Sequence, residues 1–225
     1  MIGRIIAKLK FVYLRLRIHH FNEFRESHAG FEDGKELIST DREKLRPAYE
    51  QYVREVSVPD MAASLEASTL LYRLCHANKY KRLLDLGSGF SSFVFRLYAK
   101  ETPGVKVISV DDDSQWLLKT RNFLAAQNVP LEGMMMLDAF LSSTESEFDC
   151  IFHDLNFVEV RINYVSELLT RLKPGGLLIL DDVHKREYLM AVLEKLTRQS
   201  GVLYDLKPMT LDQFGRYAIV FKRTD

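Results

Sequence analysis

Apolar and polar residues change their spacing near residue 80 of the chain. After that point, short apolar runs alternate with segments whose apolar residues recur every three or four positions, which predicts strands alternating with helices. The expected strands are Arg82–Leu86, Val105–Val110, Met134–Leu137, Phe148–His153, Gly176–Leu180, Val202–Leu206 and Tyr217–Phe221. The expected helices lie between them, over residues 92–100, 114–127, 157–172 and 185–198. Because unbroken apolar runs are typical of strands covered on both faces, we expect a doubly wound, mostly parallel α/β sheet.

The last two expected strands have no helical pattern between them, so they should run antiparallel to each other. A different, helical pattern precedes the sheet. We therefore divide the chain into an N-terminal helical extension, residues 1–60, and a main domain, residues 61–225. In this division the extension would cover the substrate and contact a second subunit or a membrane.

Three segments follow one another between the N-terminal helix and the first strand. Charged residues and glycines predict a loop over residues 22–40. One apolar face then predicts a helix over residues 41–56, with Thr40 and Glu43 in the positions of a capping box at its start. A third helix is expected over residues 61–77.

Residues 1–20 form a helical pattern with two apolar stripes. One stripe contains Ile2, Ile5, Ile6, Leu9, Val12, Tyr13 and Leu16. The opposite side carries Phe11, Leu14 and Ile18, and basic residues lie between the stripes, while no acidic residue precedes Glu23. A helix with two apolar faces needs two surfaces to bury them, so one face should pack on the main domain. The other fits either a second copy of the chain in a homodimer or a membrane surface with anionic headgroups.

Charge and cysteine content indicate which kinds of partner and which cellular compartment fit this chain. The chain has 31 Lys and Arg against 31 Asp and Glu, and this balance does not indicate a protein that binds nucleic acid. Cys75 and Cys150 lie far apart in apolar patterns and are expected to be buried thiols of a reducing compartment. No apolar run has the length of a transmembrane helix, and basic residues interrupt the N-terminus, so no signal peptide is expected. These features predict a cytoplasmic protein, with peripheral membrane contact as the open alternative.

A glycine turn follows the first expected strand of the sheet. The segment Leu83-Leu84-Asp85-Leu86-Gly87-Ser88-Gly89 runs from the strand through the turn into a helix, whose free N–H groups can face a ligand. Ser92 stands where the fingerprint of nicotinamide-binding proteins has a third glycine. Asp85, just before the turn, disfavours a pyrophosphate and suits a ligand with a cationic amino group. We therefore assign Asp85, Gly87, Ser88 and Gly89 to a cofactor site.

Acidic residues also follow the second and third expected strands. Asp111 ends the second strand at a spacing from the glycines that suits a carboxylate bound to ribose hydroxyls, with Asp112 as the neighbouring candidate. Asp113 or the serine after it is expected to cap the next helix. Asp138, after the third strand, could accept a hydrogen bond from an adenine amino group, with Phe140 against the ring; simple loop polarity is the alternative.

Five motifs in this order resemble those of the class I S-adenosylmethionine (SAM)-dependent methyltransferases. They are LLDLGSG, ISVDDD, LDAF, FDCIFHDLNF and LKPGGLLILDDVH. The resemblance covers residues 61–225, and it implies a Rossmann-like, seven-stranded sheet with a reversed last strand and SAM across the carboxyl ends of the first strands. It also implies roles for single residues. The methionine end of SAM would lie at Asp85, Gly87 and Gly89, the ribose at Asp111, and the adenine near Asp138 and Ala139.

Three acidic residues, Asp154, Asp181 and Asp182, follow the fourth and fifth expected strands. Adjacent parallel strands bring such ends together, where carboxylates repel one another unless protons or a cation such as Mg²⁺ neutralise them. The trio resembles the site of metal-dependent O-methyltransferases of the catechol and macrolide-sugar types, whose divalent metal binds two substrate hydroxyls. Catechol-type enzymes have a lysine base where this chain has Phe157, so a simple catechol is not the expected acceptor. Helix capping or water binding at the sheet edge is the alternative role of these acids.

Two histidines flank these acids and are candidates for proton transfer. His184 is the candidate base, with Asp154 as a second catalytic candidate, while His153 can point to either side of the sheet. The expected function is SAM-dependent O-methylation of a hydroxylated small molecule, sugar or glycan, with Mg²⁺ as an optional second cofactor. One alternative is N-methylation of a protein or small molecule, which the sequence Asp-Leu-Asn-Phe at 154–157 disfavours, because an asparagine-proline-proline-tyrosine motif is common there. The other is a non-catalytic SAM-binding module docked to a membrane or a partner.

Overall fold

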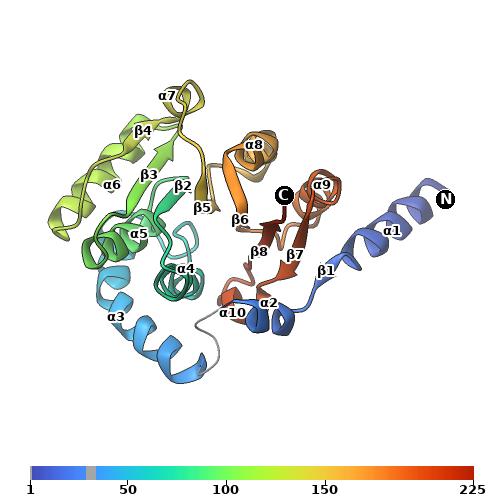
Figure 1. Cartoon of the computed structure of the whole chain (residues 1–225), viewed down its shortest axis with the longest axis horizontal. Helices are drawn as coiled ribbons and strands as arrows, with labels where there is room; N and C mark the ends of the chain where they lie inside the picture. Colours follow the sequence, from blue (N-terminus) through green and yellow to red (C-terminus); the bar gives the residue numbers. More distant parts are fainter. Residues whose placement is uncertain (1, 29–33) are drawn as a thin grey trace.

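The structure is a computed structural model that describes the backbone of residues 2–28 and 34–225 and the side chains of residues 9–28 and 38–225 (Figure 1). Its centre is a sheet of eight strands in the order β1-β7-β8-β6-β5-β2-β3-β4. The strands are β1 (Ile18–His19), β2 (Arg82–Leu86), β3 (Lys106–Asp111), β4 (Met134–Met136), β5 (Phe148–His153), β6 (Leu172–Leu180), β7 (Gly201–Asp205) and β8 (Ile219–Arg223). This is the mostly parallel α/β sheet that the apolar runs predict.

Strand β8 is the reversed strand of the sheet. It pairs antiparallel with β6 on one side and with β7 on the other, while the remaining neighbours pair in parallel. The resemblance predicted seven strands, and the additional one is the two-residue β1 from the N-terminal segment. It pairs with β7, where Ile18 lies beside Leu203, and so extends the sheet at that edge.

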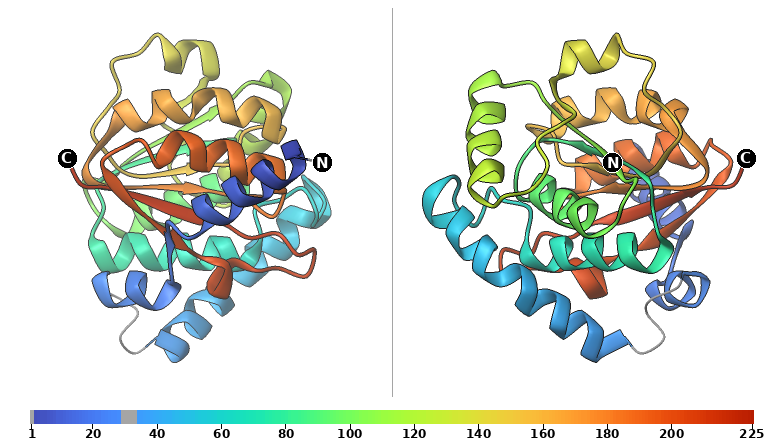
Figure 2. Two further views of the ribbon diagram at one scale, coloured as in Figure 1. Left: turned by 90° about the vertical axis from the view of Figure 1, so that its right-hand side faces the viewer. Right: turned by 60° about the vertical axis from the view of Figure 1, so that its left-hand side comes forward.

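Helices cover both faces of the sheet (Figures 1 and 2). The helices are α1 (Ile2–Arg15), α2 (Phe21–Ser27), α3 (Gly34–Glu55), α4 (Leu65–Asn78), α5 (Phe90–Glu101), α6 (Ser114–Ala126), α7 (Leu137–Leu141), α8 (Val158–Arg171), α9 (Arg186–Leu196) and α10 (Lys207–Thr210). One hydrophobic core lies under α3, α4 and α5, and the other lies under α8 and α9. The sheet is therefore the middle layer of three, which leaves the carboxyl ends of its strands free for a site.

The region before the sheet departs most from expectation. The loop predicted over residues 22–40 is wrong, because α2 and the start of α3 occupy most of it. Thr40 and Glu43 do not form a capping box, because α3 already begins at Gly34; the Glu43 carboxylate pairs with Arg46 at 2.7 Å instead. The first turns of α3 are rich in charged and polar residues, so they lack the apolar periodicity on which the prediction depended. Residues 29–33 of the predicted loop lie outside the described residues.

Three further boundaries differ from the sequence prediction. Helix α4 begins at Leu65 because the Ser64 hydroxyl accepts a hydrogen bond from the Ala67 N–H at 3.0 Å, which caps the helix there. The short helix α7 follows β4 directly, where no helix was expected. Helix α10 lies between β7 and β8, but the two strands still pair antiparallel as predicted.

Residues 1–60 pack onto the main domain rather than standing apart from it. Phe24, Leu45 and Tyr52 are buried in the same core as α4 and α5. Leu14 of α1 is buried in the core under α8 and α9. The division of the chain at residue 60 therefore does not coincide with a gap in the packing, and the separate roles expected for the extension stay predictions.

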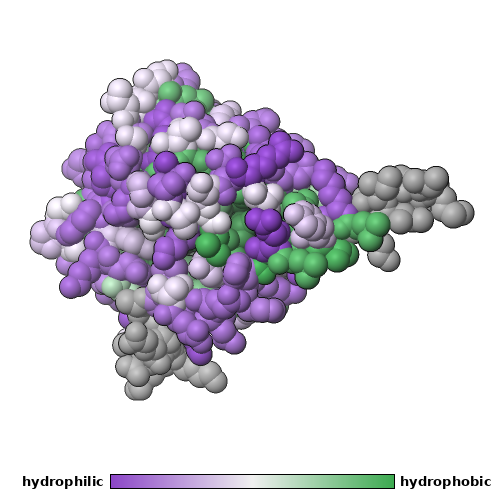
Figure 3. Space-filling view, turned by 45° about the vertical axis from the view of Figure 1, so that its right-hand side comes forward, coloured by the Kyte–Doolittle hydropathy of each residue, from purple (hydrophilic) through white to green (hydrophobic). Residues whose placement is uncertain are grey.

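Helix α1 buries only one of its two apolar stripes. Phe11 packs against the core, and the Arg186 guanidinium lies 4.5 Å from the centre of its ring. Lys10 forms an ion pair with Glu194 at 2.6 Å. The other stripe is exposed over its described residues, which are Leu9, Val12, Tyr13 and Leu16. Figure 3 shows hydrophobic side chains gathered along the described part of this helix. The residues that the structure describes include no helix long and apolar enough to cross a membrane.

Candidate active site

A pocket of about 360 Å³ opens beyond the carboxyl ends of β2, β3, β5 and β6. Its wall comes from the turn after β2, from the segments that follow β3, β5 and β6, and from the residues between α3 and α4. The lining residues used below are Tyr52, Asp60, Met61, Gly87, Ser88, Gly89, Asp111, Asp112, Trp116, Asp154, Asn156, Phe157, Arg161, Asp182, Lys185 and Arg216. The pocket therefore brings together many of the residues that the sequence singled out, at the edge where α/β sheets bind ligands.

The turn after β2 crosses the backbone of the strand beside it. Gly87 has a φ of +105°, and a Cβ there would lie 2.5 Å from the carbonyl carbon and oxygen of Asp154. The Gly87 N–H donates to the Val110 carbonyl at 2.9 Å, and the Asp154 N–H donates to the Leu86 carbonyl at 2.8 Å. The chain itself thus requires glycine at position 87, apart from any ligand.

Asp85 lies beneath this turn and is fully buried. It accepts a hydrogen bond from the Ser92 hydroxyl through Oδ2, whereas Oδ1 has no hydrogen-bond partner in the described part of the chain. Burial raises the pKa of Asp85 to about 7, and the hydroxyls of Ser92 and Ser91 oppose that shift. A buried carboxylate oxygen left without a partner under the glycine turn fits a site for a cationic amino group, although Asp85 itself does not line the pocket.

Asp111 joins the end of β3 to the glycine turn. Its Oδ2 accepts hydrogen bonds from the backbone N–H and the hydroxyl of Ser88, both at 2.8 Å. Its Oδ1 accepts from the Asp113 N–H at 3.0 Å, and burial raises its pKa. The Trp116 indole N–H donates to the Ser88 carbonyl at 2.6 Å and holds the turn from the α6 side.

The neighbours of Asp111 have separate contacts. Asp113 caps α6, as one of the two residues expected to do so, by accepting from the backbone N–H groups of Gln115 and Trp116. Asp112 accepts a hydrogen bond from the Asn156 side-chain amide at 2.7 Å. This bond links the segments that follow β3 and β5 along the pocket wall.

The segment expected near adenine lies away from the pocket wall. Asp138 and Ala139 are in the first turn of α7 and do not line the pocket, and the Asp138 carboxylate accepts from the Ala139 N–H at 2.8 Å. Phe140 is fully buried, with the Arg171 guanidinium 4.4 Å from its ring centre. Its expected position against an adenine ring is therefore wrong, because the ring is part of the core. The adenine role of Asp138 and Ala139 stays a prediction.

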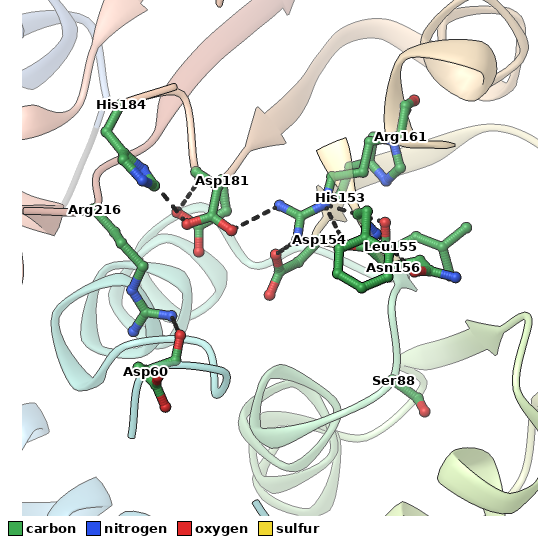
Figure 4. A network of polar contacts seen from close by, with 12 residues as sticks. Asp60, Ser88, His153, Asp154, Leu155, Asn156, Arg161, Asp181, His184 and Arg216 are labelled. Atoms are coloured by element: carbon green, nitrogen blue, oxygen red, sulfur yellow. Dashed lines mark hydrogen bonds and ion pairs between the residues drawn. The ribbon is translucent and has the colours of Figure 1, made fainter. Parts of the chain in front are cut away.

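The three acids after β5 and β6 do not meet at one point. Asp154 and Asp182 line the pocket, but Asp181 is buried and accepts a hydrogen bond from the Asp182 N–H at 2.8 Å. Arg161 of α8 pairs with both pocket acids: its Nη2 lies 2.7 Å from Asp154 (Figure 4), and its Nη1 lies 3.2 Å from Asp182. Among the residues that the structure describes, no three His, Cys, Asp or Glu side chains are arranged to hold a metal ion. The residues present do not fit the Mg²⁺ site expected from the sequence, because a guanidinium already pairs with two of its three ligands.

Burial acts differently on the acids and on the two histidines beside them. It raises the pKa of Asp181 to about 6, with Asp182 adding to the shift, and it raises the pKa of Asp154 despite the Arg161 guanidinium. His153 is fully buried, donates through Nε2 to the Arg161 carbonyl at 2.9 Å and has its pKa lowered by burial to about 4. His153 is thus held in the core and is not available as a base in the pocket.

His184 has an intermediate position. Its Nδ1 lies 3.6 Å from Asp182 Oδ1, and burial lowers its pKa, which keeps the ring neutral at neutral pH. His184 does not line the pocket directly, although its neighbours Asp182 and Lys185 do. Lys185 directly follows His184 in the chain, and Asp182 precedes it by two residues.

Several pocket residues were not identified from the sequence, among them two aromatic residues and two arginines. Tyr52 comes from α3, and its hydroxyl would lie 3.2 Å from a Cβ at Gly89. Arg216 donates to the carbonyls of Asp60 at 2.7 Å and Pro59 at 3.1 Å, and so ties the loop before α4 to the loop before β8. The others are Trp116 and Arg161. Tyr52 lies on the apolar face of the predicted helix, which predicts a core residue. The two arginines carry no pattern in the sequence that separates them from charged residues at the surface.

Comparison with known proteins identifies the class of this domain. Residues 84–183 match a family model described as a methyltransferase domain. This match spans β2 to β6, including the glycine turn, Asp111 and Asp154. Together with the sheet order and the reversed β8, this match indicates a methyltransferase domain over residues 84–183. None of the curated proteins matches this sequence.

Solved structures share the fold. The O-methyltransferase TomG from Streptomyces achromogenes, which is involved in tomaymycin synthesis and was solved with SAM, is 19% identical, with 84% of this chain and 90% of that chain covered and a TM-score of 0.59. An O-methyltransferase from Bacillus cereus in complex with SAH (S-adenosylhomocysteine) is 15% identical, with 80% and 90% covered and a TM-score of 0.62. An SAH-bound methyltransferase from Podospora anserina is 17% identical, with 84% and 88% covered and a TM-score of 0.54.

Proposed function

We propose that this protein transfers the methyl group of SAM to a hydroxyl oxygen of a small-molecule acceptor. The observation that carries the proposal is the pocket itself, which joins a glycine turn and Asp111 on one side to the acids Asp154 and Asp182 on the other. The first set suits the cofactor and the second suits an acceptor hydroxyl. SAM, when bound, supplies a methyl group on a sulfonium that is already activated, so positioning and deprotonation are what the chain must add.

The glycine turn and its two acids would hold the cofactor. Asp85 would offer a cationic amino group its Oδ1, an oxygen beneath the turn that has no hydrogen-bond partner among the described residues. Asp111 uses its oxygens for three hydrogen bonds from Ser88 and Asp113, and a carboxylate with about four lone-pair sites can still accept one from a ribose hydroxyl. Gly87 and Gly89 have no Cβ and Ser88 has a small side chain, so a ligand can lie directly against the backbone of this turn.

The opposite wall would receive the acceptor. Phe157 and Met61 line the pocket and are 70% and 68% exposed, and Lys185 also lines it. A hydroxylated ring, whether aromatic or part of a glycan, can pack on the two apolar side chains. Phe157 has no proton-accepting group, so the proton of the hydroxyl must leave by another residue.

His184 is the residue that we propose as the base. Its lowered pKa keeps the imidazole free to accept a proton, and Asp182 at 3.6 Å would stabilise the imidazolium that results. The acceptor oxygen attacks the methyl carbon as the bond between methyl and sulfur breaks, and the hydroxyl proton passes to His184. Asp154 is the second candidate for this proton, because it lines the pocket directly.

A panel of matched acceptors tests this function. Each hydroxylated ring is paired with its amino counterpart, and methyl transfer from isotopically labelled SAM is measured. Transfer to hydroxyl but not to amino acceptors is the expected result. Transfer to the amino compounds alone would instead establish an N-methyltransferase, and SAM binding without transfer to any acceptor would favour the non-catalytic module.

The exposed stripe of α1 supports one further part of the expected function. We propose that Leu9, Val12, Tyr13 and Leu16 contact a membrane surface, with the basic flanks of the helix facing anionic headgroups. The double variant Leu9→Ser/Leu16→Ser leaves the buried Leu14 untouched, so it should fold and lose binding to vesicles of anionic lipid. Unchanged vesicle binding would contradict the proposal, and a loss of dimer in solution would assign this face to a homodimer.

A further inference from the structure

Arg161 is a buried cation in the wall of the pocket. Arg161 is 6% exposed, and its Nη2 lies 2.7 Å from Asp154 (Figure 4), while its Nη1 lies 3.2 Å from Asp182. The two acids come from segments after different strands, β5 and β6. The guanidinium thus bridges the segments that follow β5 and β6, at the position where the sequence predicted a divalent metal.

The protein backbone fixes the position of this guanidinium independently of the acids. Nε donates to the carbonyls of Leu155 and Asn156, both at 3.1 Å, and Nη2 also donates to the Asn156 carbonyl at 2.9 Å. The Arg161 carbonyl in turn accepts from His153 Nε2 at 2.9 Å. Hydrogen bonds fix both the backbone carbonyl and the guanidinium of Arg161. The guanidinium therefore cannot leave this position without breaking several buried hydrogen bonds.

The charges around this position need a cation. Asp154, Asp181 and Asp182 lie close enough for each to influence the others, and Arg161 opposes that repulsion. A guanidinium and a divalent metal cannot both occupy the space between Asp154 and Asp182. One carboxylate oxygen, Asp182 Oδ1, has no hydrogen-bond partner among the described residues.

We propose that the Arg161 guanidinium takes the place of the divalent metal, so that this pocket holds Asp154 and Asp182 ready for an acceptor hydroxyl without any metal ion. The inference rests on the proposed function only for the role of these acids in methyl transfer. Arg161 is then a positioning residue, which acts through the two carboxylates. Its substitution exposes a pair of unpaired acids to which a cation can bind.

The test is the binding of Mn²⁺, followed by electron paramagnetic resonance without cofactor or acceptor. The unaltered protein should bind no Mn²⁺ at this site, and Arg161→Met should gain at least tenfold in Mn²⁺ affinity. Adding Asp154→Asn to that variant should abolish the gain. Arg171→Met is the matched control, because Arg171 belongs to the same helix, is 7% exposed and pairs with Glu167 instead; it should gain nothing.

Two results would overturn the inference. One is Mn²⁺ binding by the unaltered protein that Asp154→Asn or Asp182→Asn removes. The other is an Arg161→Met protein that still binds SAH but gains no Mn²⁺ affinity, since SAH binding shows that it is folded. These readouts need no methyl transfer, so they fail or succeed separately from the proposed function.

Kinetics then test the positioning role. Once an acceptor is identified, Arg161→Met should lower kcat at least tenfold and change the Kd for SAH less than threefold. Arg161→Lys should keep a higher kcat than Arg161→Met. A lysine keeps the charge but cannot contact two carboxylates with one planar fork. Activity that a chelator abolishes and Mn²⁺ restores in the unaltered protein would contradict the metal-independent site.

Discussion

One oxygen of Asp111 accepts both the backbone N–H and the hydroxyl of Ser88, each at 2.8 Å. These two bonds fasten the end of β3 to the glycine turn after β2. The proposed cofactor site is therefore built before any ligand arrives, and its parts can be tested one at a time.

Ser88→Ala removes one of the two bonds to Asp111 and leaves the backbone N–H in place. A hydrogen bond to a charged group contributes about 1.5–3 kcal/mol, so we expect the free energy of unfolding in urea to fall by about 1–2 kcal/mol. Ser142→Ala is the control, because its hydroxyl donates to the Asp138 carbonyl at an exposed helix end and its loss should cost under about 0.5 kcal/mol. Equal losses for the two variants would contradict the importance of the Asp111 link.

Gly87→Ala should prevent stable folding or cost about 3 kcal/mol or more. Its Cβ would lie 2.5 Å from backbone atoms of Asp154, which cannot move without separating β2 from β5. Gly104→Ala is the control, since Gly104 also has a positive φ, +78°, but has no atoms within 4 Å of its Cβ position. The control should lose only about 1–2 kcal/mol in urea unfolding. Similar losses of stability in the two variants would contradict the importance of the close approach between Gly87 and the Asp154 backbone.

Asp85 should make the protein less stable as pH rises through the neutral range. Burial raises its pKa in the folded state to about 7, so between its ordinary value of 3.8 and 7 the folded protein binds more protons than the unfolded chain. The free energy of unfolding therefore falls with rising pH in this window, by at most about 1.4 kcal/mol per pH unit. Asp85→Asn should make this slope shallower when urea unfolding is compared from pH 4.5 to 7.5, while the other buried acids keep part of it. Parallel pH profiles for the two proteins would contradict the buried, protonated carboxyl.

His184→Gln should lower kcat by about 10²-fold or more with a hydroxyl acceptor, because it removes the proposed base. In the unaltered enzyme, burial lowers the pKa of His184, so the rate should persist to pH values below the ordinary 6.5 before it falls. The variant should lack that fall. His76→Gln, at a histidine beside Glu101 and outside the pocket, should leave the rate within about twofold. A normal rate in His184→Gln would transfer the role to Asp154.

Seven of the eight strands of the sheet could be predicted from the sequence, although β6 begins at Leu172, four residues before the predicted start. Strands β2 and β5 begin and end where predicted, because strands covered on both faces stand out as runs of mostly apolar residues. The reversed β8 followed from the missing helical pattern before it. The polar start of α3 could not be predicted, since its residues lack a periodic apolar face.

The meeting of Asp111 with the glycine turn could also be predicted from the sequence, whereas the position of Arg161 could not. Asp111 and the glycine turn lie at fixed distances along the chain from strand ends, so their meeting follows from the topology. Arg161 lies in the first half of α8, among Glu159 and other polar residues that face solvent. Only the packing of α8 against β5 and β6 shows that this arginine points inward to Asp154 and Asp182, where it replaces the predicted metal.

The most direct measurement is the calorimetric titration of the purified protein with SAH, together with its Asp111→Ala variant. We predict that the unaltered protein binds SAH with one site per chain and that Asp111→Ala weakens binding at least tenfold, which corresponds to about 1.4 kcal/mol. Asp138→Ala tests the predicted adenine contact separately, because Asp138 does not line the pocket. The absence of SAH binding, or equal binding by the protein and its Asp111→Ala variant, would contradict the proposed cofactor site.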